Sequence, residues 1–196
     1  MYFEYGEQEL DHLRKDKKLG AAIERIGIVQ RRVNPDIFSA LVESIVGQQI
    51  SRKAAAIVCC KLSALCDITA ANLHRLNLEE IQACGMSMRK AGYIKNIAEA
   101  AVCKYVDFDN LHTQTDAEVI ASLTKIKGVG QWTAEMLLIF SLKRPDVVSF
   151  GDLGIRRGMM VLYGHKDMPR EIFNRYARRY SPYGSVASLY LWELSH

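Results

Sequence analysis

The sequence has few of the features that mark a membrane or exported protein. No stretch of its 196 residues approaches the roughly 20 consecutive apolar residues that a membrane-spanning helix needs. The first residues, MYFEYGEQELDHLRKDKK, are acidic before they are basic and lack the apolar core of an export signal. We therefore expect a cytoplasmic protein without a membrane partner, associated with the nucleoid if its source is a prokaryote.

Cysteine, histidine and proline are too few or too scattered to organise the chain. The five cysteines are odd in number and contain no C-x-x-C pair, which argues against a disulfide framework, a zinc site and an iron–sulfur cluster. The five histidines form no metal-ligand pattern, so we expect that no cofactor is required. Four prolines and 13 glycines leave no room for a long flexible linker.

The net charge is a modest +4, which is compatible with a polyanionic partner but does not establish one. Basic residues gather in short clusters such as Arg156–Arg157 and Arg178–Arg179. Most clusters of this kind are solvated surface, so charge alone does not identify the partner.

Alternating strand patterns bounded by hairpin turns are also missing, and helical patterns take their place. In PDIFSALVESIVGQQ, apolar residues recur at helical spacing after Asn34-Pro35, which fits a capping residue followed by proline in the first turn. Further helix starts are indicated at Ser51, Asn77, Ser87 and Thr115. The best strand candidate, DVVSF, is short and isolated, so we predict an all-α protein of about ten to twelve short helices.

A glycine turn stands out in LTKIKGVGQWTAEML, between two stretches with helical patterns. Gly128 and Gly130 permit a sharp reversal of the chain and leave the backbone amides open to a phosphate oxygen. A plain connection between two helices is the alternative. The longer pattern, however, resembles the helix-hairpin-helix motif of DNA repair proteins, which grips the DNA backbone without reading its sequence.

An aspartate in a Gly-Asp context follows the hairpin about twenty residues after Trp132. This order resembles the helix-hairpin-helix DNA glycosylase superfamily, and three other stretches match it: FSALVESIVGQQIS, SLKRPDVVSFGDLGIRRG and SPYGSVASLYLW. The resemblance covers residues 35–192 and is closest to the 3-methyladenine DNA glycosylases of the alkylation-repair branch. It implies two helical lobes around a cleft, a monomer, and duplex DNA with damaged bases as the partner. The implied domains are residues 36–144, and residues 1–35 together with 145–196.

The resemblance places the catalytic aspartate of the family at Asp152. Departure of a base builds positive charge on the sugar, which a fixed carboxylate stabilises, and the same group can activate the attacking water. Asp152 is equally well placed to cap the helix that follows it. The two roles are compatible, because a capping position holds a carboxylate at the start of a helix.

Bifunctional members of the superfamily carry a nucleophilic lysine at the position of Trp132, so the resemblance implies a monofunctional enzyme that uses water. Trp132, Met136, Leu153 and Trp192 match positions of the base pocket, where flat apolar walls receive a flipped base. Ordinary core packing is the alternative for each of them. Gly184 and Leu189 depart from the family, which often has an arginine and an aromatic residue there.

The resemblance also implies a set of DNA contacts and an ion site. Gln49, with Gln48 beside it, matches the side chain that fills the gap left by a flipped base, although both could simply form a polar helix end. The other implied DNA contacts are Ser51, Gly128, Val129, Gly130 and Thr133. The backbone carbonyls of Thr124, Ile126 and Val129 match those that bind a structural Na⁺ or K⁺ ion in the family.

Other functions remain open at this point. A glycosylase for oxidised or deaminated bases is one alternative, and a non-catalytic helix-hairpin-helix DNA-binding module is another. A helical protein-interaction domain is a third, but it would leave the glycine turn and its spacing to Asp152 unexplained.

Overall fold

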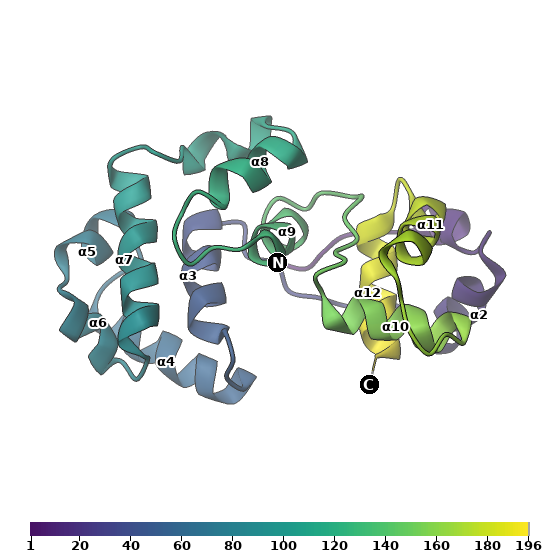
Figure 1. Cartoon of the computed structure of the whole chain (residues 1–196), viewed down its shortest axis with the longest axis horizontal. Helices are drawn as coiled ribbons and strands as arrows, with labels where there is room; N and C mark the ends of the chain where they lie inside the picture. The colour runs from purple at the N-terminus through teal and green to yellow at the C-terminus, as the bar shows by residue number, and fades with distance from the viewer. Residues whose placement is uncertain (196) are drawn as a thin grey trace. The chain divides into compact units, whose positions relative to one another are not determined.

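The computed structural model describes residues 1–195, which form short helices joined by tight connections (Figure 1). About 65% of the chain is helical, and the described residues contain no strand, only an isolated antiparallel bridge between Tyr2 and Arg32. The all-α prediction is confirmed. The helices are α1 (Glu7–Leu13), α2 (Lys17–Ile26), α3 (Ile37–Gly47), α4 (Arg52–Leu65), α5 (Ala70–Arg75), α6 (Leu78–Ala83), α7 (Met88–Val102), the 3₁₀ helix η1 (Phe108–Thr113), α8 (Asp116–Leu123), α9 (Gln131–Phe140), α10 (Leu153–Tyr163), α11 (Arg170–Tyr180) and α12 (Gly184–Leu194).

Most predicted helix starts are confirmed by capping hydrogen bonds. Side-chain oxygens of Ser51, Asn77, Ser87 and Thr115 accept the backbone amide three residues further on. Such bonds satisfy amides that have no partner inside the helix.

The predicted start of α3 at Asn34-Pro35 is wrong. Asp36 is the capping residue, because its carboxylate accepts the amide of Ser39 at 3.1 Å. Asn34 instead accepts the amide of Asp36, also at 3.1 Å, which forms a turn before the helix. A carboxylate directly before the apolar run is the better acceptor, so the proline stays outside the helix.

The chain folds into two compact units. One consists of Met1–Val33 and the chain from Leu138 onward, and the other of Asn34–Leu137. The first unit is therefore discontinuous in sequence. The division into domains at residues 36 and 144 remains a prediction.

In the discontinuous unit, α12 is the buried central helix. Leu189, Tyr190 and Leu191 have no exposed surface, and α10 approaches α12 so closely that a Cβ atom at Gly158 would lie 2.0 Å from the carbonyl oxygen of Leu191. A Cβ atom at Gly184 would lie 2.6 Å from Val148. Both positions that depart from the family, Gly184 and Leu189, are thus core positions, and Gly184 leaves no space for an arginine.

The DVVSF stretch lies against the start of α12 rather than in a sheet. The amide of Val147 donates to the hydroxyl of Ser185 at 3.0 Å, and the hydroxyl of Ser188 donates to the carbonyl of Val147 at 3.0 Å. Serine side chains therefore satisfy backbone groups that would otherwise need a neighbouring strand.

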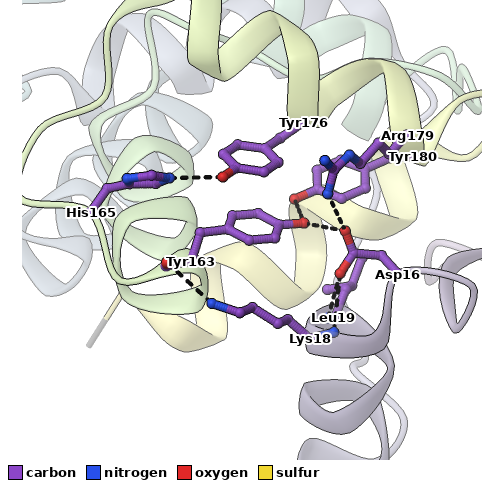
Figure 2. A network of polar contacts seen from close by, with 8 residues as sticks. All are labelled: Asp16, Lys18, Leu19, Tyr163, His165, Tyr176, Arg179 and Tyr180. Atoms are coloured by element: carbon purple, nitrogen blue, oxygen red, sulfur yellow. Dashed lines mark hydrogen bonds and ion pairs between the residues drawn. The ribbon is translucent and has the colours of Figure 1, made fainter.

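Asp16 joins the N-terminal helices to α10 and α11 within the same unit (Figure 2). One carboxylate oxygen caps α2 by accepting the amides of Lys18 and Leu19. The other accepts the hydroxyl of Tyr163 at 2.7 Å, and that hydroxyl lies 2.9 Å from the hydroxyl of Tyr180. Burial raises the pKa of both tyrosine hydroxyls above the ordinary value, so these two hydroxyls stay protonated at neutral pH.

The continuous unit is built around α7, which lies beside α3, α5 and α6 (Figure 1). Ile94 and Ile97 of α7 are fully buried, as are Leu41 and Ile45 of α3. The glycine turn connects α8 to α9, whose first seven residues belong to this unit, and the turn packs on Tyr93 of α7.

Candidate active site and nucleic-acid interface

Asp152 is held at the start of α10 by two neutral donors. Its Oδ1 atom accepts the amide of Ile155 at 2.8 Å and the indole Nε1–H of Trp192 at 2.9 Å. The predicted capping role is therefore confirmed. The side chain is buried, with 7% of the residue exposed. Neutral donors orient a carboxylate without cancelling its charge, which is what electrostatic stabilisation of a cation requires.

Trp192 has a second contact, with Phe140 at the end of α9. The two rings are stacked, with centroids 5.5 Å apart and planes 30° apart. The sequence predicted Trp192 only as a pocket wall and missed both its hydrogen bond to Asp152 and the part played by Phe140. A signal for Phe140 was present, since residues four apart share one face of a helix and Phe140 lies four residues after Met136.

Gly154 makes room for the contact between Trp192 and Asp152. A Cβ atom at this residue would lie 2.7 Å from Cδ1 of Trp192 and 3.1 Å from Oδ1 of Asp152. The sequence analysis missed Gly154 as well. The sequence did contain a signal: Gly154 stands in the first turn of a predicted helix. Glycine lowers the stability of a helix, so its presence there indicates that another group comes close to the backbone.

The other three predicted pocket residues differ in exposure. Leu153 directly follows Asp152 and is 51% exposed, while Trp132 is 41% exposed. Met136 is half-buried. Trp132 and Met136 share one face of α9, because they are four residues apart. Leu153 belongs to the discontinuous unit with Asp152 and Trp192, whereas Trp132 and Met136 belong to the continuous unit.

The two glycines of the hairpin have different structural roles. Gly128 has a φ of +107°, and a Cβ atom there would lie 2.3 Å from the ring of Tyr93. Gly130 has no other atom within 4 Å of such a position. Its carbonyl accepts the amide of Ala134 at 3.1 Å, so it occupies the position before α9 and has no side chain to cap that end.

Two predicted DNA contacts in the hairpin are restricted by the structure. Val129 is buried, and its amide already donates to the carbonyl of Ile126 at 3.0 Å, which argues against a phosphate contact by this residue. Thr133 is only 3% exposed, so its side chain has almost no surface to offer. Its backbone lies in the first turn of α9, where amides point out of the helix end.

The loop between α3 and α4 contains Gln48, Gln49 and Ile50. Gln49 is exposed and has a φ of +58°, which is unusual for any residue other than glycine. Ile50 is also exposed. Ser51 caps α4 through its hydroxyl, which accepts the amide of Ala54 at 3.2 Å.

Lys90 of α7 is hydrogen-bonded to the start of this loop. Its ammonium donates to the carbonyl of Val46 at 2.8 Å and to that of Gln48 at 2.5 Å, and burial lowers its pKa. The contact ties the end of α3 to α7 just before Gln49. Sequence reasoning missed Lys90, and no local pattern around residue 90 indicates it.

Two searches of residues 1–195 limit the kinds of site. No group of three or more histidine, cysteine, aspartate or glutamate residues in this range is arranged to hold a metal ion. None of its helices is both long and apolar enough to cross a membrane.

Comparisons with known proteins agree with the motifs. The family described as "HhH-GPD superfamily base excision DNA repair protein" matches residues 42–182. DNA-3-methyladenine glycosylase 1 of Schizosaccharomyces pombe is 32% identical over 164 residues, which is 81% of this chain and 72% of the yeast protein.

Solved structures are also similar. A Schizosaccharomyces pombe 3-methyladenine DNA glycosylase in complex with abasic DNA has a TM-score of 0.85 and 28% identity, with 95% of each chain covered. A Bacillus halodurans DNA-3-methyladenine glycosidase has a TM-score of 0.88 and 37% identity, over 100% of this chain and 92% of the other.

Proposed function

Because the chain belongs to the HhH-GPD superfamily of base excision DNA repair proteins, we propose that it is a monofunctional DNA glycosylase for alkylated purines. It hydrolyses the N-glycosidic bond of bases such as 3-methyladenine and 7-methylguanine in duplex DNA and leaves an abasic site. The names of the relatives support this substrate class. The observation that carries the proposal is the buried carboxylate of Asp152 between the indole N–H of Trp192 and the amide of Ile155.

In this mechanism Asp152 acts on the sugar of the flipped nucleotide. Loss of the base leaves an oxocarbenium-like sugar, which the negative charge of the carboxylate stabilises. The carboxylate then orients or deprotonates the water that attacks C1′. Alkylation at N3 or N7 makes the purine cationic and a good leaving group, so the reaction needs no separate general acid.

The proposed base pocket consists of Trp132, Trp192, Met136 and Leu153. Exposed apolar surface at Trp132 and Leu153 is available to replace the stacking that a base loses when it leaves the duplex. Cation–π attraction between an indole ring and a cationic purine contributes about 0.5–2 kcal/mol. This term favours alkylated bases over neutral ones.

Gln49 fills the gap in the base stack, with Gln48 and Ser51 beside it, and its exposure and left-handed backbone support this role. Gly128 and Gly130 allow a phosphate to approach the amides at the start of α9, including that of Thr133. Val129 is not part of this phosphate contact, because its amide is already bonded.

The carbonyls of Thr124, Ile126 and Val129 hold a Na⁺ or K⁺ ion in this proposal. The carbonyl of Ile126 accepts one amide at 3.0 Å and keeps a second lone pair for a ligand. Neutral carbonyl oxygens suit a monovalent cation, which when bound adds positive charge at the turn.

The protein works where chromosomal DNA is found, in the cytoplasm at the nucleoid if its source is a prokaryote.

Asp152→Asn tests the proposal most directly. The amide oxygen can still accept both hydrogen bonds, so the fold and the affinity for an abasic-site duplex should be kept. The rate of base release should fall by about 10²-fold or more. Methylated DNA is incubated with each protein, and the freed bases are identified by mass spectrometry. Duplexes with hypoxanthine or ethenoadenine measure how broad the substrate range is.

Near-normal base release by Asp152→Asn would contradict the catalytic assignment. Borohydride should trap no covalent adduct between the wild-type protein and DNA, because position 132 is tryptophan rather than lysine.

A further inference from the structure

Phe150 lies two residues before Asp152, and the guanidinium groups of two arginines lie over its ring. The guanidinium carbon of Arg170 lies 4.3 Å from the centroid of its ring, and that of Arg156 lies 5.2 Å from it. The ring itself is held edge-on by Phe173, with centroids 5.1 Å apart. Phe173 is buried, so the ring of Phe150 that both arginines contact packs on the core of the discontinuous unit.

The charges of these two arginines are not compensated by the protein. Neither side chain forms an ion pair or a hydrogen bond with any residue between 1 and 195, and Nε of Arg156 is buried without a partner. Three other arginines of the same unit do form ion pairs: Arg14 with three carboxylates, Arg31 with Glu193, and Arg179 with Asp16.

The place of Arg170 also argues for an anionic ligand. It is the first residue of α11, at the end of the helix where backbone amides carry partial positive charge and a cation is unfavourable. The preceding Pro169 gives no side-chain cap, and Glu171 lies in the same turn without forming an ion pair with Arg170. The positive charge of Arg170 is therefore unfavourable at this end of α11.

We propose that Arg156 and Arg170 bind backbone phosphates of the damaged DNA strand next to Asp152. A guanidinium placed over a ring can still offer its remaining N–H groups, whose fork geometry matches the oxygens of a phosphate. The amide of Arg156 donates to the carbonyl of Asp152 at 3.1 Å, and Phe150 lies two residues before Asp152, so both parts of this cluster are attached to the chain beside the proposed catalytic aspartate. The contact is independent of base sequence and positions the strand. This inference rests on the proposed function.

The test measures how DNA affinity depends on salt. Arg156→Met and Arg170→Met keep the length and most of the apolar contact but remove the charge, and Arg178→Met removes an exposed charge elsewhere on α11 as the matched control. Affinity for a duplex with an abasic-site analogue is measured by fluorescence anisotropy between about 50 and 200 mM KCl. Each test variant should reduce the slope of log K against log[KCl] by about 0.9 per lost phosphate contact, and Arg178→Met should not.

Lysine at either position should restore most of the salt slope, because the charge returns. Unchanged slopes in both methionine variants would overturn the inference, and so would an equal loss of slope in the control. Should Arg156→Met unfold, Arg170→Met decides alone, because Arg170 is exposed and outside the core. Base release by the wild type is measured in parallel: its absence would refute the proposed function, whereas the slopes report on phosphate contacts only.

Discussion

A methyl group at residue 154 would lie 2.7 Å from Cδ1 of Trp192 and 3.1 Å from Oδ1 of Asp152. These two side chains are the ones joined by the hydrogen bond that positions the proposed catalytic carboxylate. At the scale of the residue, the contact between Trp192 and Asp152 therefore depends on Gly154 having no Cβ atom. The proposed catalytic aspartate can be picked out from its neighbours in sequence, but Trp192, forty positions away, donates a hydrogen bond to it.

Gly154→Ala should displace the indole of Trp192 and disturb Asp152. Misplacement of a catalytic group by about 1 Å costs on the order of 10²-fold in rate, so we expect a loss of that size in single-turnover base release. Affinity for an abasic-site duplex should change little. Gly92→Ala on α7 is the control, because nothing lies within 4 Å of its Cβ position; it should keep full activity and gain about 0.5–1 kcal/mol of stability. Full activity of Gly154→Ala would show that the indole contact is dispensable.

At the scale of the element, α7 carries two lysines with the same structural role at two different loops. Lys90 donates to the carbonyls of Val46 and Gln48, just before Gln49. Lys95 donates to the carbonyls of Leu73, His74 and Leu76 at the end of α5. Both lysines satisfy carbonyl groups at a helix end, but only Lys90 lies under the loop that we propose to enter DNA.

Lys90→Met and Lys95→Met should each lower stability by about 1–3 kcal/mol, because carbonyl groups that are mostly part-buried lose their donors. Only Lys90→Met should weaken binding to an abasic-site duplex beyond what its stability loss explains, because Gln49 is then no longer held with its left-handed backbone. Urea denaturation and fluorescence anisotropy measure the two effects. Equal affinities of the two variants would exclude a role of Lys90 in positioning Gln49.

Substitution of the two hairpin glycines should likewise separate an effect on stability from an effect on DNA affinity. Gly128→Ala forces a side chain into the ring of Tyr93 at a positive φ and should cost about 1–3 kcal/mol of stability. Gly130→Ala meets no atom of the protein, so stability should hold while affinity for DNA falls, since the added methyl group faces the approaching phosphate. Thermal unfolding and DNA binding are compared for both variants. Unchanged affinity in Gly130→Ala would remove the turn from the DNA interface.

At the scale of the whole molecule, stability should depend on the buried tyrosines at high pH. Burial, and then the neighbouring Tyr180 and Asp16, raises the pKa of Tyr163 in the folded protein, whereas an unfolded tyrosine ionises near pH 10. A raised folded pKa gives stability that is complete below the unfolded pKa and is lost as pH rises above it. The discontinuous unit should therefore lose stability above about pH 10.

Tyr163→Phe tests this expectation. The variant removes a donor to Asp16, so at pH 7 it should be less stable by about 1–3 kcal/mol, and its further loss above about pH 10 should be shallower than that of the wild type. Urea unfolding between about pH 7 and 11 measures both effects. Tyr2→Phe changes an exposed tyrosine and should follow the wild-type curve. Parallel curves for Tyr163→Phe and the wild type would contradict the prediction.

Local chemistry explains what could be predicted from the sequence. Helical periodicity, the caps at Ser51, Asn77 and Thr115, and the capping role of Asp152 depend on residues within one helical turn. The start of α3 was misplaced because two acceptors, Asn34 and Asp36, compete within three residues. The family follows from motifs whose order along the chain is itself a sequence property.

The sequence by itself determined the helical class, the family, the glycine turn and the identity of the candidate carboxylate, because each rests on neighbours along the chain or on the order of motifs. Only the tertiary structure decided which groups hold Asp152, which lysine supports Gln49, and which arginines stay without a counter-charge beside Phe150. The reason is physical: hydrogen bonds, ring stacking and burial act between atoms within a few ångströms, and the partners of these residues come from helices far apart in the sequence.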